Sequence, residues 1–86
     1  MKPKLAFDPG AWDEYLFWVA QDKKVANRIN RLLEEVLRTP RAGSGKPEQL
    51  KGFSQEVWSR RITLEHRLVY VLQDDLVIVQ SCRFHY

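Results

Sequence analysis

The stretch RLVYVLQDDLVIVQSC, at residues 67–82, decides the fold of this chain. It consists of two apolar runs rich in β-branched residues, and Gln73-Asp74-Asp75 separates them. This pattern predicts a β-hairpin. An earlier run of the same kind ends at Leu64-Glu65-His66, which is a second candidate turn. The second half of the chain is therefore expected to form an antiparallel meander of three strands, at residues 57–63, 67–72 and 76–82.

A short strand and a helix are expected ahead of the meander. Residues 4–7 end in apolar side chains and predict the strand. Asp8 is a favourable N-cap and Pro9 suits the first position of a helix. The apolar residues that then recur at helical spacing, and are expected to form its buried stripe, are Trp12, Tyr15, Leu16 and Val19.

A second helix follows directly. Asp22 can cap it, and Thr39-Pro40 is expected to end it. Its apolar positions fall on one face: Val25, Ile29, Leu32, Leu33 and Val36. Residues 40–49 contain two prolines and two glycines and are expected to be a loop. The order strand, helix, helix and three strands (β-α-α-β-β-β) predicts an α+β fold, with both helices on one face of a small, mainly antiparallel sheet.

Length and composition predict a single small domain spanning residues 1–86, with a net charge of +3. Cys82 is the one cysteine, so no internal disulfide is expected. No apolar run approaches the length of a membrane span or a signal core. These features favour a cytoplasmic protein without membrane association. Positive charge is concentrated in the middle of the chain, at Arg38, Arg41, Lys46, Lys51, Arg60, Arg61 and Arg67.

Strand periodicity predicts which side chains meet. Successive strand residues point to opposite faces of a sheet. With each strand keeping that alternation, one face would hold Arg61, Arg67, Val69 and Arg83, and His85 has the same parity. The other face, toward the helices, would hold Leu68, Tyr70, Ile78 and Cys82.

A cluster of arginines with a histidine suits phosphate chemistry. Guanidinium groups donate paired hydrogen bonds to phosphate oxygens and stabilise charge in a phosphoryl transition state. Histidine can transfer a proton near neutral pH. Glu48, the one carboxylate between Glu35 and Glu56, could accept a proton from a ribose 2′-hydroxyl. The terminal Arg83-Phe84-His85-Tyr86 follows a strand directly, which would keep these side chains near the sheet.

Several long motifs resemble the YoeB toxins of bacterial toxin–antitoxin systems, within the RelE superfamily. The resemblance spans almost the whole chain, although Gln49 stands where relatives often have proline. The matching motifs are Trp12-Asp13 with Tyr15, Gly45-Lys46-Pro47-Glu48, Leu50-Lys51, Trp58-Ser59-Arg60-Arg61-Ile62-Thr63, Glu65-His66-Arg67-Leu68-Val69-Tyr70 and Cys82-Arg83-Phe84-His85-Tyr86.

The resemblance implies an endoribonuclease that cuts messenger RNA in the ribosomal decoding site and needs no metal or other cofactor. It assigns the general base to Glu48, the general acid to His85 and the stabilisation of phosphate charge to Arg67. Supporting contacts to phosphate or RNA fall on Lys51, Arg61 and Tyr86. The implied reaction is attack of a ribose 2′-oxygen on the adjacent phosphate, which leaves 2′,3′-cyclic phosphate and 5′-hydroxyl ends.

The resemblance also implies partners. These are a cognate, YefM-like antitoxin that covers the basic surface, the ribosome with its messenger RNA, and operator DNA bound only through the toxin–antitoxin complex. The resemblance leaves open whether the chain also forms a homodimer.

Two other functions stay open as well. One is a non-catalytic member of the superfamily that poisons a protein target such as gyrase, and the other is a basic module that binds nucleic acid without cutting it. Some residues are expected to serve structure alone. His66 lies near a turn with the wrong parity to join Arg67, Arg60 would be solvated on the far face or paired with an acid, and Cys82 would be a small core residue. Two histidines and a distant cysteine do not predict a zinc site.

Overall fold

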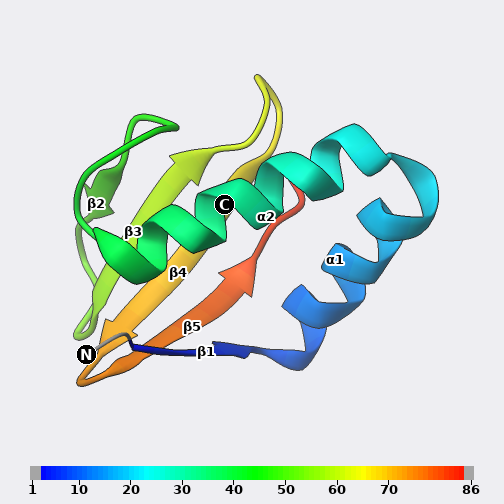
Figure 1. Cartoon of the computed structure of the whole chain (residues 1–86). Coiled ribbons are helices and arrows are strands. Elements are labelled where there is room, and N and C mark those ends of the chain that lie inside the picture. Colours follow the sequence, from blue (N-terminus) through cyan, green and yellow to red (C-terminus); the bar gives the residue numbers. More distant parts are fainter. Residues whose placement is uncertain (1–2, 85–86) are drawn as a thin grey trace.

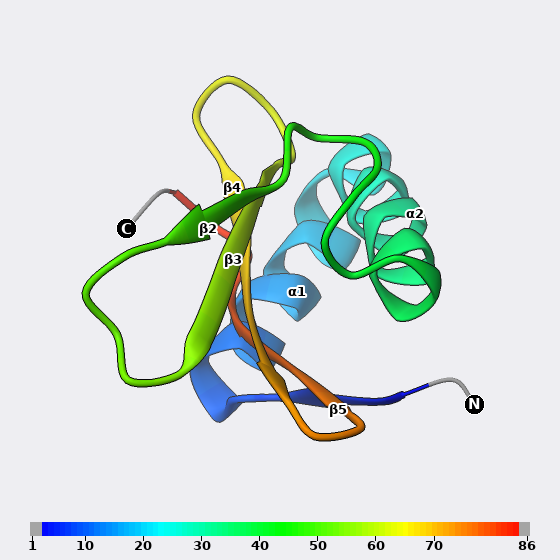
Figure 2. The ribbon, with the colours of Figure 1, turned by 90° about the vertical axis from the view of Figure 1, so that its left-hand side faces the viewer.

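A computed structural model describes residues 3–84 of the chain (Figure 1). Over this range the chain forms two helices and five strands, which are β1 (Lys4–Phe7), α1 (Pro9–Gln21), α2 (Lys23–Arg38), β2 (Glu48–Leu50), β3 (Glu56–Arg61), β4 (Arg67–Gln73) and β5 (Leu76–Ser81). Both helices lie on one side of the sheet (Figure 2). The predicted α+β fold is confirmed. His85 and Tyr86, two of the predicted site residues, lie outside the described residues.

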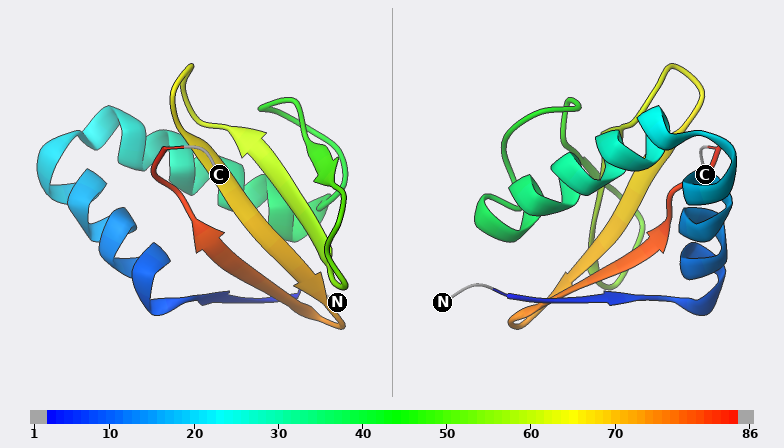
Figure 3. Two further views of the ribbon diagram at one scale, coloured as in Figure 1. Left: turned by 180° about the vertical axis from the view of Figure 1, so that it is seen from behind. Right: turned by 45° about the vertical axis from the view of Figure 1, so that its right-hand side comes forward.

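The sheet has the strand order β1-β5-β4-β3-β2. β1 pairs with β5 in parallel, and the other neighbours pair antiparallel. The view from behind shows the face of the sheet that no described helix covers, which we call the open face (Figure 3, left). No helix within residues 3–84 is long and apolar enough to cross a membrane.

The prediction of a loop over residues 40–49 is wrong at its end. Glu48–Leu50 forms the edge strand β2, with Glu48 opposite Ser59. Backbone geometry explains this pairing. Gly45 and Lys46 both have positive φ angles, of 82° and 51°, which turn the chain back toward the sheet. Gln49 therefore lies inside a paired strand, opposite Trp58.

Helix α2 supplies much of the core. Its predicted capping is confirmed, because the Asp22 carboxylate accepts hydrogen bonds from the backbone N–H groups of Lys24 (3.1 Å) and Val25 (3.3 Å). The predicted apolar face is confirmed too. Its fully buried members are Ala26, Ile29, Leu32, Leu33 and Val36, and Val25 is partly buried.

The predicted buried stripe of α1 is wrong for three of its four residues, whereas the fourth, Tyr15, is partly buried and packs against the core. Trp12, Leu16 and Val19 are 45%, 45% and 42% exposed, and the buried residues of α1 are Ala11 and Trp18. The cause is that the inner face of α1 carries Glu14, whose Oε1 accepts a hydrogen bond from the Cys82 backbone N–H at 2.8 Å. The inward face of α1 therefore carries Ala11, Glu14 and Trp18, and Tyr15 and Phe17 are partly buried beside them.

Ile78 was predicted on the helix side and lies on the open face instead. There it packs against Val57, Val69 and Val71. The reason is a β-bulge. Val69 pairs with Ser81 while Tyr70 pairs with Val79, so Gln80 is an extra residue in β5. Strand alternation reverses across the bulge, and Cys82 returns to the helix side with Leu68 and Tyr70, as predicted.

Candidate active site

The register of three strands brings Glu48, Arg61 and Arg67 to the open face. Arg61 lies directly opposite Arg67 at the end of the β3–β4 hairpin. Glu48 lies opposite Ser59, which is two residues before Arg61 and opposite Val69. Side chains of directly opposed residues share a face of the sheet. Because Val69 faces the open side, the carboxylate and both arginines face it too.

These three residues are close enough to act on one ligand. Neighbouring strands lie about 4.8 Å apart and residues rise about 3.4 Å along a strand, so the register places the Cα atoms of Glu48 and Arg67 roughly 12 Å apart. Both side chains are long and neither is fully buried. Their functional groups can therefore approach a phosphate between the strands from two sides.

A groove of about 470 Å³ with an apolar floor and a partly polar rim lies on the open face, beside this cluster. Its floor is formed by Val57, Val69 and Val71, which are 5%, 6% and 1% exposed. Phe53, in the segment between β2 and β3, lines the groove and is 60% exposed. The open face thus offers an apolar floor beside a basic end.

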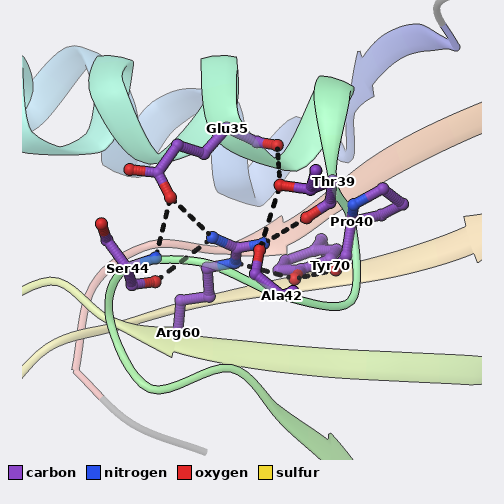
Figure 4. A network of polar contacts seen from close by, with 7 residues as sticks. All are labelled: Glu35, Thr39, Pro40, Ala42, Ser44, Arg60 and Tyr70. Atoms are coloured by element: carbon purple, nitrogen blue, oxygen red, sulfur yellow. Dashed lines mark hydrogen bonds and ion pairs between the residues drawn. The ribbon is translucent and has the colours of Figure 1, made fainter.

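Arg60 fixes the loop that leads to Glu48 (Figure 4). Its guanidinium group is completely buried and donates five hydrogen bonds. Three of them go to backbone carbonyl oxygens of the loop, those of Thr39 (2.8 Å), Ala42 (2.7 Å) and Ser44 (3.2 Å). The other two go to the Tyr70 hydroxyl at 3.0 Å and the Glu35 carboxylate at 3.3 Å. We call these contacts the Arg60 network.

Glu35 completes the network from α2. Its Oε1 accepts a hydrogen bond from the Ser44 backbone N–H at 2.8 Å. This bond, together with the nearby charge of Arg60, lowers the pKa of the Glu35 carboxyl. Gly43 is needed where the loop passes over this pair, since a Cβ there would lie 2.5 Å from Glu35 Oε1. The loop before β2 is therefore fixed by charge-assisted hydrogen bonds.

The prediction that Arg60 is solvated on the far face is wrong, and its alternative, pairing with an acid, is confirmed by Glu35. The sequence carried a usable signal. Trp58, Arg60 and Ile62 share one parity, and the other two side chains pack toward the helices. A charged residue at that position has to be buried and must find several acceptors.

Two further predicted cations occupy different surroundings. Lys51 directly follows β2 and is exposed, at the end of that strand away from the Arg61–Arg67 pair. The Arg83 guanidinium lies 3.7 Å from the centre of the Phe17 ring of α1, and Arg83 also lines the groove on the open face, where it was predicted. Of the predicted cations with described positions, Arg61 and Arg67 are the two that the register places together with Glu48.

His66 anchors the end of the described chain, in agreement with its predicted structural role. Its Nδ1 accepts a hydrogen bond from the Phe84 backbone N–H at 2.6 Å. Its ring packs edge-on against Trp18, with ring centres 4.7 Å apart. The Trp18 indole N–H in turn donates to the Cys82 carbonyl oxygen at 2.9 Å. None of these three contacts was predicted from the sequence.

The family described as "YoeB-like toxin of bacterial type II toxin-antitoxin system" matches residues 7–86. Toxin YoeB of Escherichia coli K12 is 48% identical over 83 residues, which cover 96% of this chain and 99% of that protein. The chain belongs to this YoeB-like toxin family. The resemblance predicted from the motifs is therefore confirmed.

Solved structures of YoeB toxins have the same fold. The YoeB/ParE toxin from Agrobacterium tumefaciens superposes with a TM-score of 0.92 at 47% identity, covering 96% of this chain and 99% of that one. A heterotetrameric YoeB–YefM toxin–antitoxin complex from Staphylococcus aureus contains a chain with a TM-score of 0.87 and 39% identity, and coverage of both chains is 100%. This YoeB-like toxin therefore shares the whole fold of these proteins.

Proposed function

We propose that this chain is the toxin of a type II toxin–antitoxin system and acts as a ribosome-associated endoribonuclease on messenger RNA. The observation that carries the proposal is the strand register, which gathers Glu48, Arg61 and Arg67 on an open face in a chain of the YoeB-like family. A carboxylate opposite two guanidinium groups suits the two demands of RNA cleavage, which are removal of a proton and stabilisation of a charged phosphate.

In the proposed reaction Glu48 accepts the proton of a ribose 2′-hydroxyl, and the 2′-oxygen attacks the adjacent phosphorus. Arg67 stabilises the negative charge that builds up on the phosphate oxygens. His85 donates a proton to the leaving 5′-oxygen. The products are a 2′,3′-cyclic phosphate and a 5′-hydroxyl. Arg61, Lys51 and Tyr86 support the contacts with RNA.

The proposed partners follow from the same surface. A YefM-like antitoxin is expected to lay a segment over the open face, where the apolar groove would receive it and the arginines would be covered. A complex with YefM is known for the Staphylococcus aureus relative. Binding to the ribosome is expected to use phosphate contacts and to weaken as salt rises. We also propose that the toxin–antitoxin complex binds operator DNA, and whether the toxin associates with itself is left to experiment.

The decisive experiment is primer extension on messenger RNA incubated with ribosomes and purified toxin. Wild type should produce defined cuts within codons. Glu48→Gln and His85→Ala should each reduce cleavage by about 10²- to 10⁴-fold, because each removes a proton-transfer group. Arg67→Ala should reduce it by about 10²- to 10³-fold through lost charge stabilisation. The matched control is Glu34→Gln, the same chemical change at an exposed position on α2.

Each alternative has its own outcome. Intact messages together with stalled DNA replication would favour a poison of a protein target such as gyrase. Salt-sensitive RNA binding without cuts would favour a binding module. Cleavage that survives both Glu48→Gln and His85→Ala would remove the proposed acid and base.

A further inference from the structure

Both backbone polar groups of Phe84 are bound by neighbouring residues at the start of β4. Its N–H donates to Nδ1 of His66 at 2.6 Å, and its carbonyl oxygen accepts from the Arg67 backbone N–H at 2.9 Å. The partner in the first hydrogen bond is therefore the His66 side chain, and the partner in the second is the backbone of the next residue, Arg67. Together they fix the peptide from which the chain continues to His85.

The conformation of Phe84 requires such support. Its φ angle is +61°, in the left-handed region that a bulky side chain rarely adopts. Its ring is 54% exposed, so burial of the ring does little to hold this conformation. Unfavourable backbone angles persist only where surrounding contacts impose them, and they cluster at functional sites. The hydrogen bonds that can impose this conformation are the one that Phe84 donates to His66 and the one that it accepts from the Arg67 backbone N–H.

His66 is itself held rigidly. Its backbone N–H donates to Oγ1 of Thr63 at 3.1 Å, and its carbonyl oxygen accepts from the N–H groups of Ile62 and Thr63 at 2.9 and 3.2 Å. Its ring packs against the rings of Trp18 and Phe84, whose centres lie 4.7 and 5.2 Å from its own. The acceptor atom is thus fixed relative to β4 and α1.

We infer that His66 is a positioning residue, whose Nδ1 holds Phe84 in its left-handed conformation beside the backbone of Arg67, at the point from which the chain continues to His85. This inference rests on the proposed function, in which His85 is the general acid. The imidazole has to be neutral, with its proton on Nε2, since only an unprotonated Nδ1 accepts a hydrogen bond. His66 does not touch the RNA in this scheme and acts through the backbone of Phe84.

Two substitutions separate the hydrogen bond from simple packing. Asparagine and leucine have nearly the same shape, but only asparagine offers an acceptor, and its Oδ1 lies one bond from Cγ as Nδ1 of histidine does. His66→Asn should therefore keep the bond to Phe84, and His66→Leu should lose it while still filling the space beside Trp18. Thermal unfolding of both variants checks that the fold is retained.

The first readout is independent of catalysis. Hydrogen exchange of the Phe84 amide, followed by NMR on the full chain, should be slow in wild type and in His66→Asn. It should speed up by at least tenfold in His66→Leu. Equal exchange in wild type and His66→Leu would overturn the inference, whatever the protein does to RNA.

The second readout is cleavage kinetics. His66→Leu should lower kcat by about 10- to 100-fold with little change in KM, because a small displacement of a reacting group slows the chemical step more than it weakens binding. His66→Asn should stay within about threefold of wild type, which is less than the loss of one hydrogen bond would cost. Equal losses in both variants would show that the acceptor is not what matters and would overturn the inference. If wild type itself leaves RNA intact, the proposed function fails, and the exchange result still stands on its own.

Discussion

Arg61 donates its backbone N–H to the carbonyl oxygen of Gly45 at 2.6 Å. The bond joins the last residue of β3 to the turn that precedes β2. Arg60, one residue earlier, binds the same loop through its side chain. Two consecutive residues of β3 thus fix the segment that delivers Glu48 to the open face. The position of the proposed base is set by β3 as much as by its own short strand.

Gly45 should not tolerate a side chain. Its φ angle is +82°, and a Cβ there would lie 2.9 Å from the Arg61 carbonyl oxygen and 3.1 Å from Cβ of Arg60. Gly45→Ala is expected to destabilise the fold by about 1–3 kcal/mol, through backbone strain and displacement of the loop. Cleavage should fall as well, because Glu48 follows three residues later. Urea unfolding and the primer-extension assay measure the two effects.

Two other glycines serve as controls for this substitution. Gly52 has a φ angle of +87° but open space around it, so Gly52→Ala tests strain without a clash. Gly10 lies in α1 with no atom near its missing Cβ, and Gly10→Ala should be neutral or slightly stabilising. The expected order of stability is therefore Gly10→Ala, then Gly52→Ala, then Gly45→Ala. A Gly45→Ala protein as stable as wild type would contradict the tight approach to β3.

The sequence predicted the elements well because their signals are local. The cap at Asp22, the apolar face of α2 and the two turns of the meander each depend on residues within a few positions of one another. The failures have non-local causes. Ile78 changes face because Gln80 bulges out of the pairing with β4, and Trp12 is exposed because Glu14 turns inward to bind the backbone of Cys82. Neither cause can be read from spacing.

The candidate site was predictable for a related reason. Arg61 and Arg67 flank one hairpin, so their juxtaposition follows from the turn between them. Glu48 could be proposed as a base from its chemistry, but its place beside the arginines could not be derived, because the strand that aligns it with Ser59 has just three residues and follows a loop. The role of Arg60 in holding that loop depends on acceptors from the segment 39–44 and from Glu35, which no local pattern brings together.

Arg60 should be essential for stability, in contrast to a second arginine that also contacts this region. Arg60→Met would leave the carbonyl groups of Thr39, Ala42 and Ser44 without their donor, at an expected cost of about 3 kcal/mol or more. The matched control is Arg41→Met. Arg41 pairs with Glu56 at 2.7 Å but is 60% exposed, so solvent screens the pair and its loss should cost far less than the loss of Arg60. Denaturant unfolding of the two variants decides the matter, and similar losses would contradict the structural role of the Arg60 network.

Cys82 should be unreactive in the folded protein. Burial, together with the nearby charge of Glu14, raises the pKa of its thiol from 9.0 to about 12. Since the thiolate is the nucleophile, the reactive fraction at mildly alkaline pH should be about 10³-fold smaller than in the unfolded chain. Alkylation by iodoacetamide, followed by mass spectrometry, should be very slow until denaturant is added. Equal labelling rates with and without denaturant would mean that the end of β5 opens readily.

The ion pair between Arg41 and Glu56 should make a small, pH-dependent contribution to stability. Hydrogen bonds from Arg41 (2.7 and 2.9 Å) and then from Trp58 (2.8 Å) lower the pKa of the Glu56 carboxyl from 4.5 to about 2. A lowered pKa in the folded state means that the stabilisation is fully present above pH 4.5 and is lost as the pH falls toward 2. Because the Arg41 side chain is 60% exposed, solvent screening should limit the contribution to about 1 kcal/mol or less. Glu56→Gln should therefore be slightly less stable than wild type at pH 7, and the difference between the two should shrink steadily below pH 4.5 in urea unfolding. A difference that stays constant down to the lowest pH at which the protein remains folded would show that the carboxylate charge is not its source.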